Sequence, residues 1–189
     1  FELYASGTLK LNSASDGVTG LALTPRMNWT LATALANDPD GLLTDLDILA
    51  AVALQVTGSA AIDIGNGALV ATVTGVELNL ATMDVTDGTT TLTGADILSF
   101  TGTASLFAGV GGSLNGAHTA VVNGTIGFAV NSVSLSLVSA TGALTDGANA
   151  GDSYVGVSVA LSDAQLIGVS GFELYASGTL KLNSASDGV

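Results

Sequence analysis

Residues 1–18 read FELYASGTLKLNSASDGV, and residues 172–189 read the same eighteen letters at an offset of 171 positions. Chance does not produce an identical copy of this length, whereas a recent tandem duplication does. We therefore interpret residues 1–171 as one sequence period and residues 172–189 as the start of the next period of a longer protein. The alternative interpretation is an engineered duplication of a terminal segment.

A weaker repeat lies inside the period. Four glycines each follow Ser or Thr and each open a short alternating run: Gly7, Gly58, Gly102 and Gly178. Their spacing divides the period into three diverged sub-repeats of unequal length. We place these sub-repeats at roughly 7–57, 58–101 and 102–177.

Apolar residues alternate with small or polar residues along much of the chain. The clearest alternating runs are 9–11, 76–80, 126–130, 133–137 and 155–159. Successive side chains of a β-strand point to opposite faces, so this period of two predicts strands with one apolar face. The runs predict short strands of about five to seven residues. A stretch at 29–35 is the exception, because it could form one or two helical turns.

Turn signals separate these runs at wide intervals. Asp-Gly or Asn-Gly pairs end at Gly17, Gly41, Gly67 and Gly88, which are 24, 26 and 21 residues apart. Hairpin-built sandwiches typically place a turn every 8–12 residues. We therefore predict an all-β fold, a β-solenoid of stacked short strands with about seven laps per 171-residue period. Tandem β-sandwich modules are the alternative.

Composition excludes several classes of function. The 189 residues include sixteen acidic and only three basic residues, with a formal net charge of −13, so no basic surface for nucleic acid can form. The chain has no cysteine, which excludes disulfides and thiolate sites. It has a single histidine, His118, which excludes sites built from several histidines. The stretch richest in apolar residues, 48–56, falls short of the ~20 residues of a membrane-spanning helix, so we expect no membrane insertion. No N-terminal basic region precedes an apolar core, so we expect no signal peptide in this sequence.

Thirteen of the sixteen acidic residues are Asp, and many of them fall at expected turns. Two loops offer several oxygen ligands of the kind that Ca²⁺ prefers. The candidate ligands are Asp38, Asp40, Asp146 and Asp152. The other interpretation is that Asp suits turns and keeps an apolar fibre soluble. We therefore predict no cofactor other than calcium.

The run GTLKLNSA at residues 7–14 and its relatives resemble the xGxLxLxA coils of large repetitive bacterial surface proteins, including haemagglutinin-like β-helical adhesins. The resemblance implies secretion to the cell surface or the extracellular space, a fibrous shape, and attachment or scaffolding without catalysis. The coils of those adhesins recur more evenly than the turn signals do here.

From these observations we expect a structural or adhesive repeat of a long extracellular fibre. Its expected partner is the protein itself, through end-to-end or lateral packing, with cell-surface glycans as further candidate ligands. Two alternatives remain open: a calcium-stabilised adhesin of β-sandwich modules, and a carbohydrate-processing β-helix enzyme. The enzyme would need paired carboxylates, for which Asp45 with Asp47, or Asp84 with Asp87, are the candidates.

Overall fold

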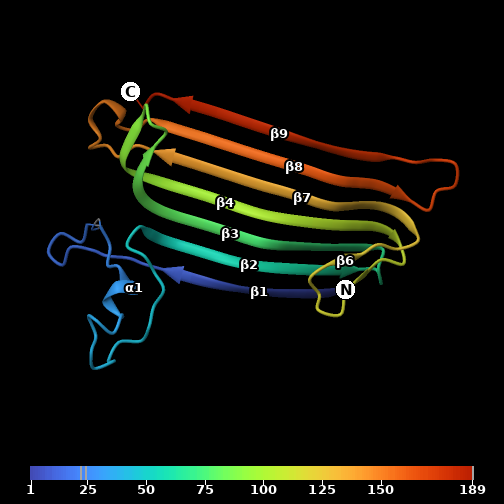
Figure 1. The fold of residues 1–189 in the computed structure, drawn as a ribbon, viewed down its shortest axis with the longest axis horizontal. Coiled ribbons are helices and arrows are strands. Elements are labelled where there is room, and N and C mark those ends of the chain that lie inside the picture. Colours follow the sequence, from blue (N-terminus) through green and yellow to red (C-terminus); the bar gives the residue numbers. More distant parts are fainter. Residues whose placement is uncertain (22, 24, 189) are drawn as a thin grey trace.

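The computed structural model describes residues 1–21, 23 and 25–188, so Val189, the last residue of the second copy, lies outside it. Seven strands form one antiparallel sheet in the order β1-β2-β3-β4-β7-β8-β9 (Figure 1). Their bounds are β1 (Glu2–Leu11), β2 (Val52–Ile64), β3 (Leu69–Thr86), β4 (Thr91–Val110), β7 (Ile126–Thr141), β8 (Ser153–Ile167) and β9 (Tyr175–Ser186). Each strand pairs with the next one along this series, and the fold is all-β, as the sequence predicts.

The solenoid of short strands predicted from the turn spacing is not what the structure shows. The strands of the main sheet are 10 to 20 residues long and join as hairpins, and they also do not form tandem sandwich modules. Two of the four turn signals, at Gly67 and Gly88, lie at hairpin ends, whereas Gly17 and Gly41 lie in the irregular segment between β1 and β2. Asn66 and Gly67, both at positive φ, connect β2 to β3, and Gly88 at φ +92° helps connect β3 to β4. A spacing of 21 residues is therefore one long strand with its turn.

Bulges explain why two predicted short strands become one long strand. The alternating runs 126–130 and 133–137 both belong to β7, and the register against β4 shifts between the pairs Ala104–Val133 and Leu106–Val130. One extra residue in β7 restores the phase of the alternation across this bulge. Gly75, at φ +59°, marks the same kind of shift in β3.

One row of directly paired residues crosses the whole sheet: Leu9, Val56, Leu78, Phe100, Leu137, Val157 and Leu182. Directly paired residues point to the same face of a sheet. We call this side the apolar face, because the apolar residues of all five alternating runs point to it. Several of its side chains are exposed, including Leu9, Leu11, Leu80, Leu98, Leu180 and Leu182.

The opposite side, which we call the polar face, is lined in its middle by hydroxyl and charged side chains. One of its rows consists of Thr8, Thr57, Glu77, Thr101, Ser136, Ser158 and Lys181. While the buried Val130 and Ala164 belong to the apolar face, much of the core of the molecule lies at the two ends of the polar face. At one end, the insertion that carries β5 (Ser113–Leu114) and β6 (Val121–Val122) covers Val70 and Phe107, both fully buried, and Gly112 lies directly against the Phe107 ring.

At the other end of the polar face, Leu92, Ala95 and Ala140 form a buried cluster. The segment 142–152, which includes η1 (Gly147–Asn149), lies beside this cluster, since Asn149 Nδ2 donates a hydrogen bond to the Thr91 carbonyl oxygen at 3.1 Å. The sheet is thus a single layer with local cover at both ends of one face.

The segment between β1 and β2 is mostly irregular and lies beyond the ends of these strands (Figure 1). It contains α1 (Trp29–Ala32), which confirms the helical turn suggested by the sequence at 29–35. The Asn28 side chain caps α1 by accepting the Leu31 N–H at 3.1 Å. Among the described helices, none has the length and apolar character needed to cross a membrane.

Candidate functional site

The two margins of the sheet are made of the same sequence. β1 lies in the first copy of the eighteen-residue repeat, and β9 lies in the second copy, at the opposite margin of the sheet (Figure 1). β1 pairs only with β2, and β9 pairs only with β8, within the part of the chain that the structure describes. Each copy therefore has one outer edge whose N–H and C=O groups are available to another strand.

The two copies use opposite edges of the same strand. Five strands lie between β1 and β9, each antiparallel to its neighbours, so β1 and β9 run in the same direction. The row that starts at Leu9 ends at Leu182, the copy of Leu11, so the two strands also turn the same side chains to the apolar face. Because β1 and β9 share both their direction and their apolar face, β2 pairs with one edge of the repeated strand and β8 pairs with the opposite edge.

A constant stagger relates the two copies. The row from Leu9 ends at the copy of Leu11, and the row from Leu3 ends at Ala176, the copy of Ala5. Six strand spacings span about 29 Å and two residues span about 7 Å, so the strands tilt by only about 13° from the perpendicular to the stacking direction. Closed barrels need about 35–45°. This stagger favours an open sheet that continues from its edge.

Two glycines set how closely β1 approaches β2. Gly7 pairs with Gly58, and a Cβ added to Gly7 would lie 2.6 Å from the Thr57 carbonyl oxygen. A Cβ added to Gly58 would lie 2.7 Å from the Ser6 carbonyl oxygen. At Gly178, the copy of Gly7, an added Cβ would meet nothing within 4 Å. Two of the four repeat glycines, Gly7 and Gly58, thus mark a close backbone contact, while the three sub-repeat boundaries remain a prediction from sequence.

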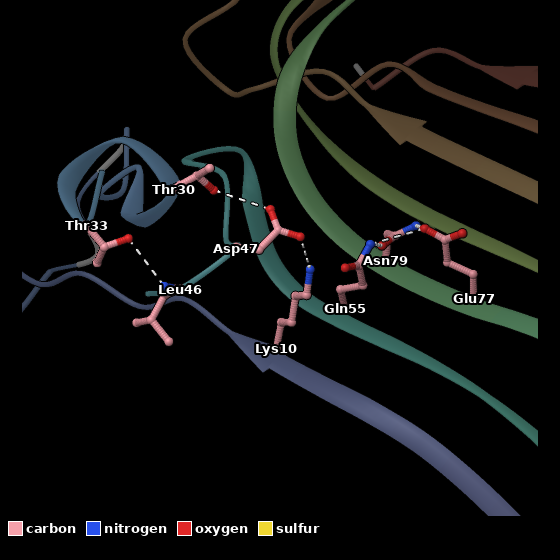
Figure 2. A network of polar contacts seen from close by, with 8 residues as sticks. All are labelled: Lys10, Thr30, Thr33, Leu46, Asp47, Gln55, Glu77 and Asn79. Carbon is pink, nitrogen blue, oxygen red and sulfur yellow. Dashed lines mark hydrogen bonds and ion pairs between the residues drawn. The ribbon is translucent and has the colours of Figure 1, made fainter. Parts of the chain in front are cut away.

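Two separate groups of polar contacts lie near the end of β1, one at Lys10 and one at Gln55 (Figure 2). Lys10 Nζ lies 2.9 Å from Asp47 Oδ2, and Lys10 is paired in the ladder with Gln55. Gln55 Nε2 donates to Glu77 Oε1 at 3.1 Å and to Asn79 Oδ1 at 2.9 Å. The hydrogen bond and positive charge of Lys10 lower the pKa of the Asp47 carboxyl group. The Lys10–Asp47 contact fastens the end of β1 to the segment before β2, and the Gln55 hydrogen bonds join β2 to β3.

An aromatic contact fastens the other end of β1. The Tyr4 and His118 rings stack with centroids 3.6 Å apart and an interplanar angle of 8°. The Tyr4 hydroxyl donates to Glu2 Oε2 at 2.9 Å, and this hydrogen bond raises the pKa of the tyrosine. His118 had no functional role among the expectations from sequence. Tyr4 and His118 are far apart in the chain, and no sequence motif signals their contact.

The repeated sequence adopts one conformation after the end of β1 and another within β9. Asn12 is buried and donates through Nδ2 to the Met27 and Leu49 carbonyl oxygens, at 2.9 and 3.3 Å, while its Oδ1 accepts the Trp29 Nε1–H at 3.1 Å. Its copy, Asn183, lies on an extended β9 and pairs with Gly156. The neighbours decide this conformation, since the local sequence is identical.

Three of the four predicted calcium ligands accept backbone hydrogen bonds. Asp38 accepts the N–H groups of Leu42 and Leu43, at 3.1 and 2.7 Å. Asp146 accepts the Thr93 N–H at 2.9 Å, Asp152 accepts the Gly188 N–H at 3.1 Å, and Asp40 lies in an exposed turn. The described residues bring together no group of three or more His, Asp or Glu side chains that could hold a metal ion. Calcium binding remains a prediction, which a fall in Tm on chelation would support.

Three of the four carboxylates considered for glycoside hydrolysis also have local partners. Asp47 contacts Lys10, Asp84 accepts the Gly94 N–H at 2.7 Å, and Asp87 accepts the N–H groups of Thr89 and Thr90. Hydrogen bonds from Thr90 and Thr89 lower the pKa of Asp87. Asp45 lies in the exposed segment before β2. These contacts give the aspartates turn-capping or strand-anchoring roles.

No known protein family, curated protein or solved structure matches the chain. The function proposed for this chain therefore depends on its own geometry. The most informative part of that geometry is the pair of identical edge strands.

Proposed function

We propose that the chain is a structural or adhesive repeat of a long fibre at the cell surface or outside the cell, which acts mechanically and without catalysis. One observation carries the proposal: the identical strands β1 and β9 share direction and face but use opposite edges. In a chain with further periods, a single strand could pair with β8 of one period and with β2 of the next. The hydrogen-bonded sheet would then continue from period to period.

Such a fibre would have strands perpendicular to its long axis. Six strands per period would advance it by about 29 Å. Adjacent strands of a sheet rotate by about 20–25° relative to one another, so one period would turn the sheet by about 120–150°. The sequence suggested that the chain winds as a solenoid. In this arrangement, the winding would instead come from the twist of the whole sheet.

The two faces support different roles in such a fibre. The middle of the polar face carries Ser and Thr hydroxyls, and the net charge of −13 favours solubility. The apolar face exposes leucines on β1, β3, β4 and β9, and exposed apolar surface of this kind often marks an interaction site. Lateral packing of two sheets through their apolar faces, about 10 Å apart, would bury it.

Chains of one, two and four periods, each followed by residues 172–189, test the proposal. We expect their length in small-angle scattering and electron microscopy to increase by about 29 Å per period. Oriented fibres should give a reflection at about 4.7–4.8 Å along the fibre axis. A matched control replaces the strand at each junction by a scrambled sequence of equal composition and should lose the regular increment. A string of separate beads in the unscrambled chains would contradict the proposal.

A further inference from the structure

We infer that β9 is a transferable copy of β1, and that the edge of β2 in one molecule is a binding site for β9 of a second copy of this chain. The inference deepens the proposed function and rests on it, because it makes the repeated strand a connector between separate molecules as well as between covalently linked periods. The bound segment would be 173–182, the copy of residues 2–11.

The register of this binding follows from the β1–β2 ladder. Gly7 pairs with Gly58, Leu9 with Val56, and Lys10 with Gln55. In the second molecule these places would be taken by the identical residues Gly178, Leu180 and Lys181. Every backbone and side-chain group that β2 contacts in its own β1 is therefore present in the incoming strand. Exchange of an identical element between molecules needs little free energy because lost contacts are replaced in kind.

Contacts outside the ladder would be replaced as well. Lys10 contacts Asp47, and Tyr4 stacks on His118. The copies Lys181 and Tyr175 are exposed on β9, and Tyr175 is 71% exposed against 36% for Tyr4. On the β2 edge of a second molecule, Lys181 and Tyr175 would reach the same aspartate and the same histidine ring.

The incoming β9 would keep its bond to its own sheet. It pairs with β8 through one edge and would meet β2 of the second molecule through the other. The exchange displaces only β1, whose side chains are all exposed except for a half-buried Lys10. In the unmodified chain, the tethered β1 competes at a high effective concentration. Weakening β1 alone should therefore reveal the exchange.

The paired glycines provide a way to weaken either copy. In Gly7→Ala, the added methyl group meets the Thr57 carbonyl oxygen at 2.6 Å and should loosen the chain's own β1. In Gly178→Ala, the methyl group meets nothing within 4 Å, so the chain's own sheet should be unaffected. The same methyl group would, however, meet Thr57 of a second molecule when β9 enters the β2 edge.

The test compares four full-length chains by sedimentation velocity over a range of concentrations: the unmodified chain, Gly7→Ala, Gly178→Ala and the double variant. We expect Gly7→Ala to form concentration-dependent oligomers, with an apparent association constant at least tenfold above that of the double variant. Gly178→Ala and the double variant should remain monomers. A Gly7→Ala chain that stays monomeric, or a double variant that associates as strongly as Gly7→Ala, would overturn the inference.

Cysteine cross-linking in the Gly7→Ala background, where β1 is loosened, tests the register of the exchange. The chain has no cysteine, and Val56 pairs with Leu9 of its own molecule while Leu180 lies at the other margin of the sheet. A disulfide between Val56→Cys and Leu180→Cys must therefore join two molecules. The matched control is Val56→Cys with Lys181→Cys, because Lys181 is the copy of Lys10 and would point to the opposite face at Gln55.

Mild oxidation should give multimers linked between positions 56 and 180, at least tenfold more than the 56–181 control. Equal yields from the two pairs would contradict the inference. A further variant, Leu9→Cys with Leu180→Cys, reports direct pairing of β1 with β9, and cross-links found only in this variant would also contradict it. If chains of several periods lengthen regularly while separate molecules do not cross-link, only strand exchange is refuted and the proposed function stands.

Discussion

Gly7 and Gly178 occupy the same place in the repeated sequence, but an added methyl group meets different surroundings at each. The methyl group on Gly7 would lie 2.6 Å from a backbone oxygen of β2, which cannot move without shifting the strand. We predict that Gly7→Ala lowers the free energy that holds β1 on the sheet by about 1–3 kcal/mol, as overpacking does. Gly178→Ala should change stability by less than about 0.5 kcal/mol. Hydrogen exchange of the β1 and β9 amides measures both, and equal effects would contradict the close contact at Gly7.

Asp47 and Asp87 are two of the three aspartates with a lowered pKa, and they make stability depend on pH at the scale of single residues. The pKa of Asp87 is lowered by hydrogen bonds from Thr90 and Thr89, and the pKa of Asp47 by Lys10. A carboxyl group with a depressed folded pKa stabilises the fold above its unfolded pKa of about 3.9, and this contribution is lost as the pH falls through the folded value. We therefore expect stability to decline below about pH 4. Carboxyl NMR titration should show the Asp47 pKa rising towards its ordinary value in Lys10→Met while that of Asp87 stays unchanged.

At the scale of elements, the insertion that carries β5 and β6 gives the polar face its best-packed end. Phe107 is fully buried beneath it, whereas Phe100 lies half-buried on the apolar face. We predict that Phe107→Ala costs about 3–5 kcal/mol of unfolding free energy. Phe100→Ala should cost at most half as much, because its side chain already contacts solvent. Urea denaturation of both variants measures the difference. Equal losses would mean that the apolar face is covered in solution.

The alternating runs predicted which residues share a face, and this part of the fold could be derived from sequence. The apolar residues of 126–130 and 133–137 do lie on one face of β7, but sequence alone could not show that a bulge joins the two runs into one strand. A turn every 21–26 residues fits both a solenoid lap and a long hairpin. Only the pairing of β2 with β3 through Asn66 and Gly67 separates these possibilities, and that pairing is a long-range property.

At the scale of the whole molecule, the identity of residues 1–18 and 172–189 was visible in the sequence, but its meaning was not. Whether the two copies expose the same edge or opposite edges depends on how many strands separate them and on which face each turns outward. Each period contributes an even number of strands to the sheet, so β1 and β9 run in the same direction. The stagger of two residues keeps the same side chains on the same face, so the two copies expose opposite edges. The contacts of Tyr4 with His118 and of Lys10 with Asp47 likewise depend on the complete topology.

Charge should control how whole molecules associate. With sixteen acidic and three basic residues, any two copies repel each other at neutral pH. The screening length falls from about 8 Å at 0.15 M salt to about 3 Å at 1 M. We therefore predict that association of the Gly7→Ala chain strengthens by at least several-fold over this range of salt, measured by sedimentation equilibrium at pH 7. The double variant Gly7→Ala, Gly178→Ala has the same charge and should remain a monomer throughout. If salt drives both variants together equally, the association arises from the exposed apolar face. If salt weakens the association of Gly7→Ala, attraction between charged groups holds the copies together, and repulsion between acidic molecules does not limit their assembly.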